Sequence, residues 1–223
     1  MSIVRKIIIG YDSCEDLAYK ACVNSLIVNS KDHLDIIPLI QKDLIQQKIY
    51  TRCIDPLAST EFAFTRFLTP YLCNYNGWAV FCDCDFIFLD DISSLFELVD
   101  ERYAVMCCQH DYKPTSIYKM DNKIQHLYPR KNWSSLVLWN CKHPKNKLLT
   151  PDIINTQTGQ FLHRFEWLND SEIGSIPIEW NWLVGWYQEP RDGKPKALHF
   201  TEGGPWLDKY KDCEYSSLYN QYK

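Results

Sequence analysis

The sequence predicts a single α/β domain with a mostly parallel, doubly wound central sheet flanked by helices. Short β-branched and aromatic runs alternate with helical segments through the first half of the chain, as such a sheet requires. The 223 residues, 46% of them hydrophobic, are enough for one substantial core. No linker, repeat or low-complexity tract divides the chain, so residues 1–223 are expected to fold together.

In the first half, strands and helices are expected to alternate. Ile7-Ile8-Ile9 is the centre of a first strand, and apolar positions at helical spacing follow from Glu15. Ser59 or Thr60 is expected to cap a helix that runs towards Tyr71, where Pro70 bends or ends it. The expected strands are 4–9, 34–39, 78–82 and 103–108, and the other expected helices are 15–28 and 94–99.

The second half is less regular and richer in aromatic residues. Leu136-Val137-Leu138-Trp139 predicts a strand, and Thr150-Pro151-Asp152 opens a helix because proline favours the first helical turn. Two later apolar runs, 173–178 and 197–200, predict further strands.

Charge and composition exclude several classes of protein. The formal net charge of −4 leaves no basic footprint for nucleic acid. No apolar stretch reaches the 18 residues of a membrane span, and the apolar run after Arg5-Lys6 is too short for a signal peptide. The ten cysteines form no CxxC pair and fit buried thiols, so a reduced, cytoplasmic protein is expected.

The most informative motif is Asp83-Cys84-Asp85, which follows the buried run Trp78–Cys82. Side chains i and i+2 of an extended chain point the same way, roughly 7 Å apart, so the two carboxylates repel each other unless a cation lies between them. Hard oxygen ligands at the carboxyl end of a strand suit Mg²⁺ or Mn²⁺ carrying a phosphate. The alternative is a solvated loop, but Phe86-Ile87-Phe88-Leu89 is expected to continue the buried strand, and buried charge needs a partner.

A second motif, His199-Phe200-Thr201-Glu202-Gly203-Gly204-Pro205-Trp206, ends the last expected strand. An imidazole can complete a divalent metal site that already has two carboxylates. The glycines permit a tight turn and close backbone approach to a phosphate. The alternative is a core histidine beside an ordinary Gly-Gly turn.

Together, the Asp-x-Asp (DxD) motif and the later His-Phe-x-x-Gly-x-Pro-Trp motif resemble the glycosyltransferases of the GT-A (Rossmann-like) fold. The resemblance is to the glycogenin and lipopolysaccharide galactosyltransferase group and to a chlorovirus capsid glycosyltransferase domain, and it runs from Ile7 to Trp206. It implies that Asp83, Asp85 and His199 hold Mn²⁺ (or Mg²⁺) on the diphosphate of a nucleotide-sugar donor, a UDP-sugar. It also implies a nucleotide-binding half, about 1–110, and an acceptor-side half, about 111–223.

The same resemblance implies roles for residues near the donor. Gly10, Tyr11 and Asp12 match the end of the first strand, where the family holds the base; the alternative is a plain strand-to-helix turn. Arg66 lies on an otherwise apolar helix and is expected to contact the donor and to serve catalysis, with a salt bridge to Asp83 or Glu61 as the alternative.

Further donor contacts are expected later in the chain. Ser134 and Ser135 match small residues that face the donor sugar, and Gly203 and Gly204 match the phosphate turn. Asp170 is nominated as the catalytic carboxylate nearest the anomeric carbon, with an Asn-Asp loop turn as its alternative.

One departure concerns the leaving group. Gly204 stands where the family has a lysine near the diphosphate. The metal, glycine N–H groups, Arg66, Lys194 or Lys196 must therefore meet the leaving-group charge.

The resulting prediction is a metal-dependent glycosyltransferase that moves a sugar to a saccharide or glycoconjugate acceptor. The resemblance implies retention of the anomeric configuration; for inversion, Asp170, Glu172 or Asp111 is the candidate base. Two other functions remain open: a phosphatase of the aspartate-nucleophile type, and a non-catalytic module that binds sugar nucleotides or glycans. A homodimer is also left open.

Overall fold

A computed structural model describes residues 4–53, 58–111, 130, 132–189, 191 and 193–223. The strands are β1 (Arg5–Tyr11), β2 (Leu34–Ile40), β3 (Trp78–Cys82), β4 (Phe86–Phe88), β5 (Val105–Cys107), β6 (Leu136–Asn140), β7 (Ile173–Ser175), β8 (Trp182–Leu183) and β9 (Ala197–His199). The α-helices are α1 (Asp16–Asn29), α2 (Gln41–Gln46), α3 (Thr69–Leu72), α4 (Pro151–Thr156), α5 (Gly159–His163) and α6 (Ser216–Tyr219). Short 3-10 helices are Ser13–Glu15, Thr65–Leu68, Ile92–Glu97, Pro144–Leu148, Asp170–Glu172, Ile178–Asn181 and Asp208–Tyr210.

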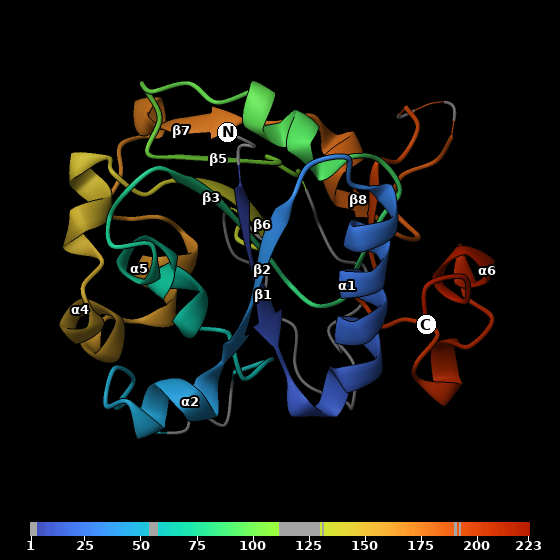
Figure 1. The fold of residues 1–223 in the computed structure, drawn as a ribbon, viewed down its shortest axis with the longest axis horizontal. Helices are drawn as coiled ribbons and strands as arrows, with labels where there is room; N and C mark the ends of the chain where they lie inside the picture. Colours follow the sequence, from blue (N-terminus) through green and yellow to red (C-terminus); the bar gives the residue numbers. More distant parts are fainter. Residues whose placement is uncertain (1–3, 54–57, 112–129, 131, 190, 192) are drawn as a thin grey trace.

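The central sheet confirms the predicted fold class. Its six strands lie in the order β2-β1-β3-β6-β5-β7, and β6 runs antiparallel to both of its neighbours while the other pairs are parallel. Figure 1 shows α1 on one side of the central strands and α4 and α5 on the other. Both faces of the sheet are thus covered, which explains why its strands are continuous apolar runs.

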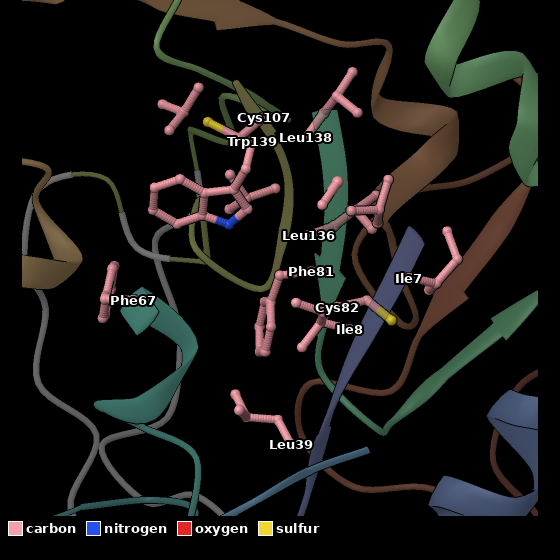
Figure 2. Packing of buried hydrophobic residues seen from close by; sticks show 14 of the residues in the cluster. Ile7, Ile8, Leu39, Phe67, Phe81, Cys82, Cys107, Leu136, Leu138 and Trp139 are labelled. Carbon is pink, nitrogen blue, oxygen red and sulfur yellow. The ribbon is translucent and has the colours of Figure 1, made fainter. Parts of the chain in front are cut away.

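The core lies on the central strands β1, β3 and β6 (Figure 2). Ile7 and Ile8 of β1 and Phe81 of β3 have no exposed surface. On β6, Trp139 stacks on Trp167 at 6.3 Å between ring centroids. This packing anchors the strand from which the DxD motif emerges.

A second sheet of three strands, in the order β4-β9-β8, corrects the expectation that Phe86–Leu89 continues the Trp78 strand. The chain turns between Asp83 and Asp85, and β4 then pairs antiparallel with β9 instead of joining the central sheet. The turn takes the two acids out of a regular strand, because the chain changes sheet at this point.

The segment after Thr60 also differs from the expected single helix. It forms a turn, the 3-10 helix Thr65–Leu68 and then α3, with Pro70 in the first turn of α3. Proline is tolerated there because a first-turn N–H has no partner within the helix. Pro70 therefore begins a helix and does not end one.

The remaining expected elements are present with shifted ends. The short helix after Asp91 is the 3-10 helix Ile92–Glu97, and Thr150 caps α4 by accepting a hydrogen bond from the Ile153 N–H. In the described part of the chain, no helix has the length and apolar character needed to cross a bilayer.

Candidate metal centre

Two sheets meet at the carboxyl end of β3 and bring three metal-ligating side chains together there. Asp83 and Asp85 follow β3, and His199 ends β9 directly opposite Phe86. One ligand atom from each of Asp83, Asp85 and His199 lies within 4.8 Å of the others. The Phe200 N–H also donates to the Asp85 carbonyl at 3.0 Å, which holds the end of β9 against the turn. The structure therefore assembles the predicted ligand set from distant parts of the chain.

His199 is almost completely buried, with 2% of its surface exposed. Its ring stacks on Phe86 at 4.4 Å between centroids, and its Nε2 lies 3.4 Å from Asp85 Oδ2. Its Nδ1 is 2.8 Å from the amide oxygen of Asn181, in the 3-10 helix that precedes β8. Stacking on one face and a hydrogen bond on the far edge fix the ring, so that Nε2 faces the acid.

Asp83 is held by Arg66. The guanidinium lies 2.7 Å from Asp83 Oδ1 and also donates to the Ser134 carbonyl at 3.0 Å. Arg66 is only 5% exposed and lies over the rings of Phe62 and Phe81. The salt bridge that was the alternative to donor contact is thus the observed arrangement. Arg66 therefore holds Asp83 in place, and the catalytic and donor-binding roles expected of Arg66 stay predictions.

Glu15 is a buried acid next to the DxD turn. One of its carboxylate oxygens lies 3.5 Å from the Cys84 thiol, and within the described residues the other has no hydrogen-bond partner. Burial first, and then the charges of Asp85 and Asp12, raise the pKa of Glu15 to about 8. At neutral pH this carboxyl group therefore holds its proton and adds no charge to the cluster.

The residues at the end of β1 serve the local fold. A side chain on Gly10 would lie 2.5 Å from the Phe62 ring, so glycine is required for that packing. Asp12 accepts the N–H groups of Cys14 and Glu61 through its two oxygens. The Tyr11 hydroxyl donates to Asp16 at 3.2 Å. These contacts support the strand-to-helix turn, while base binding by the three residues stays a prediction.

Ser134 and Ser135 immediately precede β6, and the backbone of Ser135 contacts that of Asp83. The Ser134 hydroxyl is 2.9 Å from His163 Nδ1, and the Ser135 hydroxyl contacts the side chain of Asn181 at 2.9 Å. The Asp83 N–H donates to the Ser135 carbonyl at 2.9 Å. Both serines are nearly fully buried, so the structure places them beside the cluster, and contact with the sugar stays a prediction.

The glycine turn follows β9 directly. Gly203 has a φ of 121°, which glycine adopts without strain, and its N–H donates to the Phe200 carbonyl at 2.8 Å. A side chain on Gly204 would overlap the Trp206 ring. Packing of Trp206 therefore explains why no lysine stands at Gly204.

Asp170 is not brought to the cluster. It precedes β7, whose first residue pairs with Val105 at the amino end of β5, whereas the acids follow the carboxyl end of β3. Its side chain is 91% exposed and forms an ion pair with Arg130. The catalytic role nominated for Asp170 therefore has no support from its position, because β7 starts at the opposite edge of the sheet.

Sequence reasoning assigned no role to three polar residues of the site: Asn181, His163 and Glu15. Asn181 contacts His199 directly, whereas His163 contacts the Ser134 hydroxyl and Glu15 contacts the Cys84 thiol. A polar residue within an apolar or aromatic run was the available signal for Asn181, which lies between Trp180 and Trp182. His110 is a further buried histidine nearby, and burial, followed by the charge of His199, lowers its pKa to about 3.

The cluster fits a divalent cation. Opposite ligands of one ion are separated by about 4.2 Å, so the observed spread of 4.8 Å requires only small side-chain movements. Two carboxylates with one imidazole form a donor set that Mn²⁺ accepts. Asp85 Oδ2 and His199 Nε2 lie 3.4 Å apart, so one cation could contact both atoms.

Comparison with known proteins places the chain in a family. It is 54% identical over 217 residues to Protein CDI of Arabidopsis thaliana, covering 96% of this chain and 84% of that protein. No protein-family model matches the chain.

Solved structures share the fold at low sequence identity. The apo bifunctional glycosyltransferase WbbM has a TM-score of 0.64 and 13% identity over 100% of this chain and 52% of its own. GlyE of Streptococcus pneumoniae TIGR4 has a TM-score of 0.64 and 16% identity over 98% of this chain and 59% of its own. The galactosyltransferase LgtC in complex with donor and acceptor sugar analogs has a TM-score of 0.56 and 11% identity over 97% of this chain and 94% of its own. The chain thus has the GT-A glycosyltransferase fold, and it spans only 52% and 59% of the length of the first two structures.

Proposed function

The chain belongs to the same family as Protein CDI of Arabidopsis thaliana, and from this premise, together with its GT-A fold, we propose that it is a metal-dependent glycosyltransferase. The observation that carries the proposal is the convergence of Asp83, Asp85 and His199 at the sheet edge where α/β folds bind ligands. The donor is a nucleotide sugar, a UDP-sugar, and the acceptor is a saccharide or glycoconjugate. A cytoplasmic location is part of the proposal, because most of the cysteines are buried thiols, which suit a reducing compartment.

Asp83, Asp85 and His199 would hold Mn²⁺ or Mg²⁺ against the donor diphosphate. When bound, the cation supplies Lewis-acid neutralisation of the charge that develops on the leaving diphosphate. Arg66 orients Asp83 from behind and pairs with its carboxylate, while Phe86 and Asn181 hold the His199 ring. The protein thus meets the reaction with a site whose ligands are already oriented, which reduces reorganisation during the reaction.

Two of the basic side chains considered for the leaving group already pair with acids of the protein. Lys196 pairs with Asp90 at 3.3 Å and lies over Trp180, at the end of β9 away from His199. Arg66 is committed to Asp83. We therefore propose that the Gly204 N–H and the metal meet most of the diphosphate charge, with Lys194 as the remaining basic candidate, because the Gly203 N–H already donates to the Phe200 carbonyl. We also propose that the anomeric configuration is retained. The proposal does not include a homodimer.

The test is a panel of nucleotide sugars incubated with the protein in Mn²⁺ or in EDTA, with mass detection of the released sugar. Donor hydrolysis that requires Mn²⁺ supports a transferase, and anomer analysis of the product reports the stereochemistry. Thermal stabilisation that needs both Mn²⁺ and UDP, without any turnover, would favour a non-catalytic binding module. Hydrolysis of simple phosphate esters with no sugar release would favour the phosphatase alternative and contradict the proposal.

A further inference from the structure

We propose that Ser135, acting through Asn181, fixes the tautomer of His199 so that its Nε2 stays unprotonated and available to a cation. The inference rests on the proposed metal site. It assigns Ser135 and Asn181 as positioning residues, which act on the cation through His199.

The hydrogen-bond chain begins at a backbone carbonyl, which can accept a hydrogen bond but cannot donate one. The backbone carbonyl of Asn132 accepts the Ser135 hydroxyl at 2.7 Å. A hydroxyl has one proton, and this contact uses it, so towards any other neighbour the Ser135 oxygen can only accept. That neighbour is the Asn181 amide nitrogen, at 2.9 Å. The direction of the first bond therefore determines which end of the Asn181 amide faces Ser135.

The orientation of the Asn181 amide in turn determines which nitrogen of the His199 ring carries the proton. With its nitrogen turned to Ser135, Asn181 presents its carbonyl oxygen to His199 Nδ1 at 2.8 Å. A carbonyl oxygen can only accept, so Nδ1 carries the proton and the neutral ring leaves Nε2 with a lone pair. This Nε2 faces Asp85 Oδ2 at 3.4 Å.

Asp85 by itself favours the opposite tautomer. A carboxylate oxygen near Nε2 attracts a proton to that nitrogen, and an Nε2–H group cannot bind a metal. The relay opposes this tendency, and it does so without water, because Ser135, Asn181 and His199 are 3%, 0% and 2% exposed. If the Ser135 hydroxyl is lost, nothing in the relay holds the amide direction, and rotation of the Asn181 amide lets the proton move to Nε2.

Ser134 provides the matched control. It adjoins Ser135 and is similarly buried, but its hydroxyl contacts His163 Nδ1 and not Asn181. Removing the Ser134 hydroxyl therefore creates a comparable loss of a buried hydrogen bond while the relay stays intact. The two serine variants separate tautomer control from general destabilisation.

The test is nitrogen NMR of the metal-free, ¹⁵N-histidine-labelled protein at pH 8, above the ordinary titration range of imidazole. The His199 signals are assigned by their loss in H199N. Wild-type protein should show a protonated Nδ1 and a bare Nε2, and S135A should show the proton on Nε2. S134A should keep the wild-type pattern, and so should N181D, because a carboxylate still accepts from Nδ1–H.

Manganese affinity, measured by calorimetry without a donor, provides the second readout. S135A should weaken binding roughly 10–100-fold, the range expected for loss of a group behind a metal ligand, and S134A should weaken it less than about 3-fold. If S135A does not fold, S135C takes its place with the same expectation, because a thiol is a poor donor and acceptor. A His199 proton on Nδ1 in the serine-135 variant, or on Nε2 in the wild type, would overturn the inference. Both results are independent of sugar transfer, so they stand even if no nucleotide sugar is turned over.

Discussion

Two pairs of acids flank the short strand β4, and a basic residue at each end of the neighbouring strand β9 faces one pair: His199 ends β9, and Lys196 immediately precedes it. Before β4, Asp85 faces His199 at 3.4 Å; after β4, Asp90 faces Lys196 at 3.3 Å. Because β9 runs antiparallel to β4, its two ends bring these two bases to opposite ends of the strand.

The two ends differ in burial and in what the second acid does. The side chains of Asp85 and His199 are 12% and 2% exposed, whereas those of Asp90 and Lys196 are 47% and 43% exposed. Asp91 caps the following 3-10 helix by accepting the Ser93 N–H at 3.0 Å, while Asp83 forms a buried pair with Arg66. Two neighbouring aspartates are therefore not enough to make a candidate metal site. Their burial and the groups around them decide whether they can form one.

The largest expected effect comes from substituting an acid at the buried end. D85N should reduce Mn²⁺-dependent donor turnover by on the order of 100-fold or more, because a neutral amide is a weak ligand and compensates less charge. The measurement is the rate of sugar release at saturating donor. D90N is the matched substitution at the exposed end. If D85N and D90N had similar turnover, the contrast between the two ends would fail.

The second prediction concerns the partner of Asp83. R66M should lower the free energy of unfolding by about 3 kcal/mol in metal-free protein, because it leaves a carboxylate buried without its cation. Saturating Mn²⁺ with UDP should recover part of that loss, since the metal supplies positive charge to the same carboxylate. Denaturant titrations with and without the ligands measure both values. If R66M lowered the free energy of unfolding equally with and without Mn²⁺ and UDP, Asp83 would not be a metal ligand.

Glu15 gives a prediction of pH dependence. Its folded-state pKa of about 8 lies above the ordinary value of 4.5, so the native protein keeps a proton that the unfolded chain releases. The stability contributed by this group is therefore complete below pH 4.5 and is lost as pH rises towards 8. E15Q, which stays neutral, should be more stable than wild type by roughly 4 kcal/mol at pH 8 and about equal to it at pH 4.5. A stability difference that did not change with pH would contradict the raised pKa.

The smallest expected effect is at the exposed end. D90N should change the free energy of unfolding by less than about 0.5 kcal/mol, because exposed ion pairs contribute little. The pKa of Asp90 is lowered first by the Asp91 N–H and then by Lys196, so its contribution is present at neutral pH and is lost only in acid. Thermal shift by Mn²⁺ with UDP should match wild type. Loss of that shift in D90N would mean that the cation site extends along β4.

Local patterns predicted much of the fold, and the resemblance of two motifs to a known family predicted the candidate metal ligands. β3 was predicted with its observed ends, because Gly77 and Asp83 bound an apolar run that is too short for a helix and suits a buried strand. The convergence of His199 with the acids was expected from the resemblance of two motifs. The switch of β4 to a second sheet was not predicted, because an apolar run has no feature that specifies which strand it will pair with.

The supporting residues were harder to predict, because their roles depend on partners far away in the sequence. Arg66 was expected to contact the donor, but burial against Phe62 and Phe81 directs its guanidinium to Asp83. Asp170 was placed by motif order, but the strand register puts it at the other edge of the sheet.

By itself, the sequence determined the α/β class and the strand that ends in the DxD motif, because hydrophobic periodicity is a local property. The three candidate metal ligands followed from the resemblance of two motifs to the GT-A glycosyltransferases. Only the tertiary structure decided that β9 crosses to β4, that Asn181 stands between Ser135 and His199, and that Asp85 and Asp90 have different surroundings. The physical reason is that hydrogen-bond direction and burial depend on neighbours brought together by folding. Asp83 and Asp85 therefore began as a motif, and the folded chain surrounds them with the groups that orient a ligand set.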